Sequence, residues 1–248
     1  MHNGVLGEKM AKTEPKMEFW GLEVPTEYPI TEHVTYSEKG KELTAENREA
    51  WIEFSRGIKA TAYRFIAFKE LILQMETKWA ALELYPDHRY LFEQERDLLS
   101  LFVFGVSAIE STYYSLYVLA TQANPTALEF GDIKGRKWGS DPRQIKKQIK
   151  SALGNVSIIA AIRSIERSAN WRDWNQYRNQ MFHSVASPRT HRLNVSSNPP
   201  KPNILDYGPT WCTPALLKNS WQFQEYLPWL SSKIARLMAE GSKIEKNA

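Results

Sequence analysis

Hydrophobic residues recur at helical spacing in the first half of the chain. Between residues 45 and 84 they stand three, four or seven positions apart, as in an amphipathic helix that buries one face. These positions are Trp51, Phe54, Ile58, Phe65, Phe68, Ile72, Met75 and Trp79. Thr44 is typical of a helix start, and Pro86 marks a turn. The pattern therefore predicts one long helix over about residues 45–84.

A second long helix is predicted over residues 87–122, and it contains the longest apolar stretch of the chain. That stretch, 98–120, is interrupted by several polar or small residues. They are Ser100, Gly105, Ser107, Glu110, Ser111 and Thr112. A helix needs about 20 mostly apolar residues to cross a membrane. We therefore predict a buried core helix here and expect no membrane association.

Turn-forming residues divide the rest of the chain into shorter elements. Residues 123–140 are predicted to form a loop, and residues 189–212, rich in Pro, Asn and Ser, a second, long loop. Strand signals are weak throughout. The remaining predicted helices are 143–153, 156–168, 170–186 and 213–240.

These elements predict an all-α fold, with residues 43–248 forming a single helical bundle. Residues 1–42 contain Pro15, Pro25 and Pro29 among polar residues. We expect this segment to be an N-terminal arm that is partly extended or disordered.

Composition supports a packed chain in a reducing compartment. The chain of 248 residues is 42% hydrophobic and contains nine Trp, which argues against general disorder. Its one cysteine, Cys212, cannot form an internal disulfide, and the N-terminus lacks the apolar run of a signal peptide. A cytoplasmic location is therefore expected. Without a cysteine cluster, we expect no metal and no cofactor.

Charge is distributed unevenly along the chain. Residues 136–192 contain 12 Lys or Arg and 3 Asp or Glu, whereas residues 1–135 contain 14 and 21. Such a basic segment either attracts a polyanion or is balanced by the acidic half in three dimensions, and the sequence leaves both interpretations open. Candidate phosphate contacts, which are solvated surface residues in the alternative, are Lys146, Lys147, Lys150, Arg189 and Arg192.

The predicted helix 170–186 carries the candidate chemistry. Each residue advances about 100° around a helix, so Asn179 and His183 share a face and extend a polar stripe that begins at Asn175. Arg178 lies about 140° from His183 in projection. The aromatic residues beside the stripe are expected to pack in the core or at a dimer interface rather than to stack on bases. They are Trp171, Trp174 and Tyr177.

The chemistry of these side chains suits RNA cleavage without a metal. An imidazole titrates near neutral pH, so His183 can transfer a proton at a ribose 2′-hydroxyl or at the leaving oxygen. A guanidinium stays charged and binds phosphate through two donors, so Arg178 can stabilise the transition state. Asn179 would orient the imidazole or contact the substrate. By spacing alone, however, an Arg and a His five positions apart are more often a surface or packing pair.

Glu110 stands in the most apolar helix of the chain. Because an unpaired buried carboxylate is costly, we predict that Glu110 pairs with Arg178 or a nearby hydroxyl and positions the guanidinium. The alternative is a carboxylate on a solvent-facing or dimer-facing surface.

Residues of this helix resemble the HEPN superfamily of small helical bundles. The family motif is an Arg, usually a polar residue, a few further residues and a His. The matching residues here are Arg178-Asn179-Gln180-Met181-Phe182-His183. The apolar helix over 104–117, with Glu110 embedded, is similar to the core helix of the family. The resemblance covers about residues 45–190.

The resemblance implies a bundle of about four or five helices that forms a homodimer, with the motif of each subunit facing a shared cleft. It implies metal-independent RNA cleavage, often in toxin, phage-defence or RNA-processing settings, sometimes with an antitoxin or other partner protein. Arg178 and His183 would be the catalytic pair and Asn179 the supporting residue. Some members are non-catalytic, so a module that binds RNA, nucleotide or a partner protein is the alternative.

Overall fold

The computed structural model describes residues 18–19, 21–80, 88–128, 142–154, 156–183, 192–194, 201–203 and 223–246. At some helix ends and in two strands it describes the backbone but not the side chains. These residues are 78–80, 90–91, 94, 142–146, 156, 180–183, 192–194, 201–203 and 223–224.

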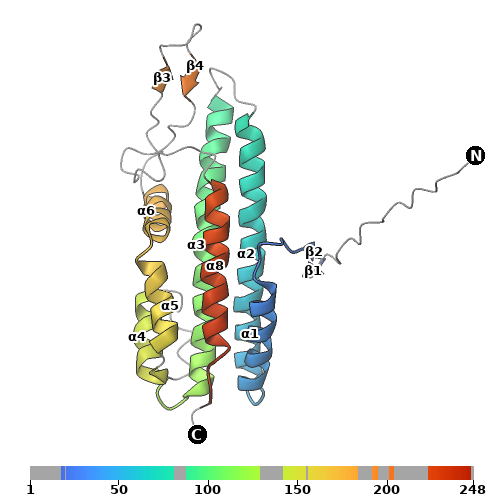
Figure 1. Ribbon diagram of the computed structural model, residues 1–248, viewed down its shortest axis with the longest axis vertical. Coiled ribbons are helices and arrows are strands. Elements are labelled where there is room, and N and C mark those ends of the chain that lie inside the picture. Colours follow the sequence, from blue (N-terminus) through green and yellow to red (C-terminus); the bar gives the residue numbers. More distant parts are fainter. Residues whose placement is uncertain are drawn as a thin grey trace, which may run out of the picture.

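Two long antiparallel helices, α2 (Arg48–Ala80) and α3 (His88–Ala123), form the centre of the bundle (Figure 1). Their apolar rows meet along most of their length, as the spacing of the hydrophobic residues predicted. Gly57 lets the two backbones approach closely, because a Cβ there would lie 3.2 Å from the backbone nitrogen of Ser115. The two predicted long helices are therefore confirmed.

Helix α1 (Ile30–Leu43) packs beside α2, so the expected arm over residues 1–42 is wrong for its last part. Its buried residues recur three or four positions apart and are His33, Tyr36, Gly40 and Leu43. The Tyr36 hydroxyl lies 3.1 Å from Oγ of Ser115 on α3 and anchors the helix. Pro29 directly precedes α1, where a proline does not interrupt helical hydrogen bonds. The prolines were therefore a poor guide to where the helix begins.

Three short helices form the opposite side of the bundle (Figure 1). They are α4 (Pro142–Leu153), α5 (Val156–Glu166) and α6 (Ala169–His183), close to the predicted ranges. Helix α8 (Phe223–Gly241) lies along α3 and ends one residue after the predicted end. Its predicted start at residue 213 lies outside the described residues. The all-α class is thus confirmed.

Two small antiparallel hairpins complete the described structure. The first pairs β1 (Glu18–Phe19) with β2 (Leu22–Glu23), and its turn contains Gly21 at φ 80°. The second pairs β3 (Arg192–Asn194) with β4 (Lys201–Asn203) inside the segment predicted as a long loop. Neither hairpin was predicted, and neither changes the helical class.

A cluster of aromatic side chains packs α6 against the central helices. Trp174 is fully buried and contacts rings from α2, α3 and α8. These rings are Phe68, Phe102, Tyr226 and Trp229. Gly105 of α3 makes room for the indole, since a Cβ at that position would lie 2.6 Å from Cζ3 of Trp174. Among the described helices, none is long and apolar enough to cross a membrane.

Candidate functional site

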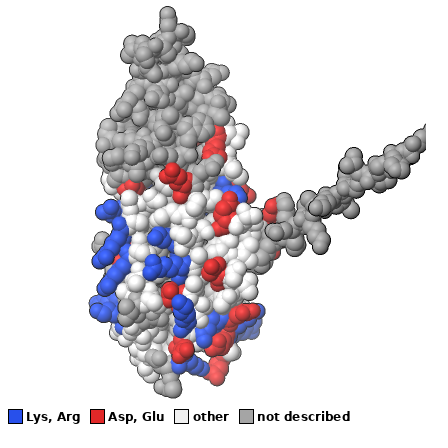
Figure 2. Space-filling view, viewed as in Figure 1, with Lys and Arg blue, Asp and Glu red and all other residues white. Residues whose placement is uncertain are grey.

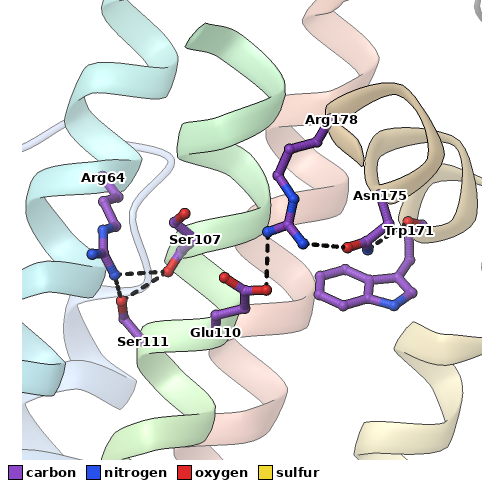
Figure 3. A network of polar contacts seen from close by, with 7 residues as sticks. All are labelled: Arg64, Ser107, Glu110, Ser111, Trp171, Asn175 and Arg178. Atoms are coloured by element: carbon purple, nitrogen blue, oxygen red, sulfur yellow. Dashed lines mark hydrogen bonds and ion pairs between the residues drawn. The ribbon is translucent and has the colours of Figure 1, made fainter. Parts of the chain in front are cut away.

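Arg178 turns from α6 toward α3 and forms an ion pair with Glu110 (Figure 3). The Nη1 atom of Arg178 donates to Oε1 of Glu110 at 3.0 Å, and both side chains are about one-fifth exposed, at 21% and 23%. The predicted pairing of Glu110 with Arg178 is therefore confirmed. The contact joins residues 68 positions apart in the chain, so it forms only when α3 and α6 pack together.

Asn175 completes the contacts of this guanidinium. Its Oδ1 accepts a hydrogen bond from Nη2 of Arg178 at 3.2 Å, and its Nδ2 donates to the backbone oxygen of Trp171 at 2.9 Å. The sequence placed Asn175 in the polar stripe without linking it to Arg178. The three-residue spacing on one helix was the available signal.

Arg64 of α2 lies on the other flank of α3 (Figure 3). Its Nη1 donates to the backbone oxygen of Ser107 at 3.1 Å and also to Oγ of Ser111. Burial lowers the pKa of the Arg64 guanidinium, and the negative charge of Glu110 partly opposes that shift. Sequence analysis missed Arg64, because nothing local marks an arginine whose partners lie more than 40 residues away.

Glu110 therefore lies between two cations that come from different helices. Arg64 and Arg178 place two positive charges beside the Glu110 carboxylate. Glu166 is a second carboxylate nearby, because burial and then the charges of Glu166 and Glu110 raise the pKa of Tyr113. A guanidinium has five N–H donors, and the described contacts of Arg178 use two of them. The remaining donors can bind an oxyanion.

The other predicted site residues do not join this network. Asn179 is exposed and its side chain forms no hydrogen bond with any described residue, so its predicted supporting role stays a prediction. His183 is the last residue of α6, and its side chain lies outside those described. Position 183 follows Asn179 by four residues and Arg178 by five, which places it about 140° from Arg178 around the helix.

The aromatic residues of α6 belong to the core, as predicted. Trp171, Trp174 and Tyr177 are 8%, 0% and 2% exposed. Tyr177 packs against Phe102 of α3 with ring centroids 4.7 Å apart. These rings fix the rotation of α6 about its axis, and that rotation aims Arg178 at Glu110.

The candidate phosphate contacts are only partly described. Lys147 and Lys150 are exposed on α4, whereas for Lys146 and Arg192 the backbone alone is described and Arg189 lies outside the described residues. Figure 2 shows Lys and Arg side chains along the left edge of the molecule, where Figure 1 places α4, α5 and α6.

No group of three or more His, Cys, Asp or Glu residues in the described part of the chain is placed to hold a metal ion. Comparison of the chain with protein-family models, with curated proteins and with solved structures finds no match.

Proposed function

We propose that this chain is a metal-independent endoribonuclease of the HEPN type, acting in a toxin, defence or RNA-processing setting in the cytoplasm. The observation that supports it best is the half-buried Arg178, held by Glu110 and Asn175 with donors to spare, on the helix that ends at His183. A guanidinium oriented before substrate arrives stabilises developing phosphate charge at little cost in reorganisation.

In the proposed reaction, the ribose 2′-hydroxyl loses its proton and its oxygen attacks the adjacent phosphorus. The bond from phosphorus to the 5′-oxygen breaks, and that oxygen takes up a proton. His183 carries out one of these proton transfers, and Arg178 binds the non-bridging oxygens as negative charge grows. Asn179 contacts the imidazole or the substrate from the neighbouring turn.

The geometry of α6 favours a site shared by two copies of the chain. Arg178 points at α3, whereas position 183 lies about 140° away around the same helix. One phosphate reaches both groups in a single chain only if Arg178 leaves Glu110. A second copy that contributes its own His183 removes that requirement, so we propose a homodimer with the motif at its interface.

Cleavage of a fluorescent RNA in EDTA tests the assignment. We expect His183→Ala and Arg178→Ala each to slow cleavage about 100-fold or more, because each removes one transition-state interaction. Arg48→Ala, which removes an exposed cation of α2, is the matched control and should cleave normally. Equal rates for the wild type and His183→Ala would exclude the proposed mechanism.

One observation favours a non-catalytic module that binds RNA, nucleotide or a partner protein. The contacts of Arg178 with Glu110 and Asn175 are satisfied within the chain, as in an ion pair that only joins two helices. Such a module would bind RNA equally well with or without the His183 imidazole and would release no product. The same assay, with binding measured alongside cleavage, separates the two functions.

A further inference from the structure

The outer surface of α4, α5 and α6 carries positive charge alone. Among its described residues, twelve are exposed, of which five are cationic and none is acidic. The five form what we call the cationic face: Lys147, Lys150, Arg163, Arg167 and Arg172. The acidic residues of these helices, Glu166 and Asp173, are not exposed and have other interactions.

The cations of this face have no partner in the described part of the chain. None of their side chains forms an ion pair or hydrogen bond with a described residue. Elsewhere, exposed cations are often paired within the chain, as Arg56 is with Glu53 at 2.7 Å and Arg89 with Glu93 at 3.0 Å. The cationic face is therefore free to bind an anion from outside.

Three arginines of the face follow one another along the chain into α6, and we call them the arginine row. Arg167 comes directly after α5, and its backbone nitrogen donates to the backbone oxygen of Arg163 at 3.1 Å, so the two residues are one turn apart. After Ala169 at the start of α6, the exposed positions among its described side chains are Arg172, Gln176 and Asn179, spaced four and three residues apart. Residues at these spacings share one side of a helix, and the next position of the series is 183. The row thus ends at the residue proposed to transfer protons.

We propose that Arg163, Arg167 and Arg172 bind the phosphate backbone of single-stranded RNA and lead the strand along α6 to His183. Arginine binds phosphate oxygens through paired donors, and the amides of Gln176 and Asn179 can donate to and accept from base edges. The proposal rests on the proposed function in one respect, that the polyanion is RNA.

The composition of the face argues against an anionic membrane as the partner. A helix that lies in a membrane surface presents large apolar side chains beside its cations. None of the exposed large hydrophobic residues in the described structure lies on α4, α5 or α6. The exposed apolar residues of α5 and α6 are Ala160 and Ala169.

The test compares two triple variants with the same change in net charge. One is Arg163→Gln, Arg167→Gln and Arg172→Gln. The control removes three exposed cations of α1 and α2, as Lys41→Gln, Arg48→Gln and Arg56→Gln. Both are made with His183→Ala, so that a fluorescent single-stranded RNA oligonucleotide stays intact during anisotropy titrations from low to high salt. Thermal unfolding confirms that each variant is folded.

We expect the arginine-row variant to bind RNA at least about tenfold more weakly at low salt. The slope of log affinity against log salt should fall by about 2, since each lost phosphate contact on a single strand removes about 0.7. The control should keep the slope of the parent. Equal losses in both variants, or none in the arginine-row variant, would overturn the proposal.

Two further measurements, vesicle binding and RNA cleavage by the wild type, separate this proposal from membrane binding and from the nuclease proposal. Binding to vesicles of equal parts phosphatidylserine and phosphatidylcholine that depends on the arginine row, while RNA binding does not, would assign the face to a membrane instead. If the wild type fails to cleave but RNA binding depends on the row, the nuclease proposal fails and this one stands. If the wild type cleaves and the row leaves binding unchanged, this proposal fails and the nuclease stands.

Discussion

The two sides of the bundle differ in the charge of their exposed side chains. On α1, α2 and the turn between them, the exposed charged residues between positions 30 and 77 comprise five acidic and three basic side chains. On α4, α5 and α6, all five exposed charged side chains of the described part are basic. In the described part of residues 136–192, the excess of Lys and Arg is therefore found at the surface, which favours an external polyanion over internal balance.

The same contrast holds for the buried polar contacts. On the α1 side, the Tyr28 hydroxyl meets Nδ1 of His33 at 2.7 Å inside an aromatic cluster, and nothing about the contact suggests a ligand. At Glu110 on α3, Arg178 of α6 donates to the carboxylate and Arg64 of α2 lies on the other flank. The contact of Tyr28 with His33 is buried in the core, whereas the pair of Arg178 and Glu110 is about one-fifth exposed and can bind an anion.

The largest expected effect is on the free energy of unfolding, where α6 packs against the central helices. Trp174→Ala removes a fully buried indole and should lower the free energy of unfolding by about 3–5 kcal/mol. Trp51→Ala on α2 removes a half-buried indole and should cost clearly less. Urea denaturation measures both. Equal losses would show that α6 is no more dependent on aromatic packing than the α1–α2 side.

A smaller effect is expected on the α1 side, where burial lowers the pKa of His33 to about 4. Below the ordinary pKa of 6.5, the unfolded chain binds a proton that the folded chain does not. Stability should therefore fall as the pH drops from 6.5 toward 4, by at most about 1.4 kcal/mol per pH unit from this residue. His33→Gln should remove that share of the pH dependence, measured by urea denaturation across the pH range.

An unchanged pH dependence in His33→Gln would mean that other groups cause the acid loss of stability. RNA binding by the cationic face should be the same in this variant, because His33 lies on the other side of the bundle.

The smallest effect on stability is expected at two comparable carboxylates. Glu110→Gln on α3 keeps an acceptor for Arg178 but loses the charge that holds it, and should cost less than about 2 kcal/mol. Glu53→Gln on α2 is the matched change, because Glu53 accepts from the Tyr114 hydroxyl at 2.6 Å and from Arg56. Cleavage of RNA should fall about tenfold in the first variant and stay normal in the second. Equal cleavage by both would show that Glu110 does not position Arg178 for catalysis.

Much of the fold follows from local patterns in the sequence. The spacing of apolar residues was enough to place α2 and α3, and turn residues located α4, α5 and α6 to within three residues at each end. Helix α1 was missed because its one fully buried ring, Tyr36, stands among charged and small residues, and the prolines before it suggested an extended chain. Periodicity predicts a helix well only when large apolar residues mark the buried face.

The candidate site, too, could be predicted from the sequence only in part. The sequence alone determined that Glu110 needed a partner and that Arg178 was available, because a carboxylate in an apolar helix is costly without one. Only the tertiary structure decided that Arg64 flanks the same carboxylate, and that the side chains of Arg163, Arg167 and Arg172 form no ion pair with a described carboxylate. Such contacts depend on how helices distant in sequence are rotated about their axes and packed against each other. No local pattern in the sequence determines those rotations and packing angles.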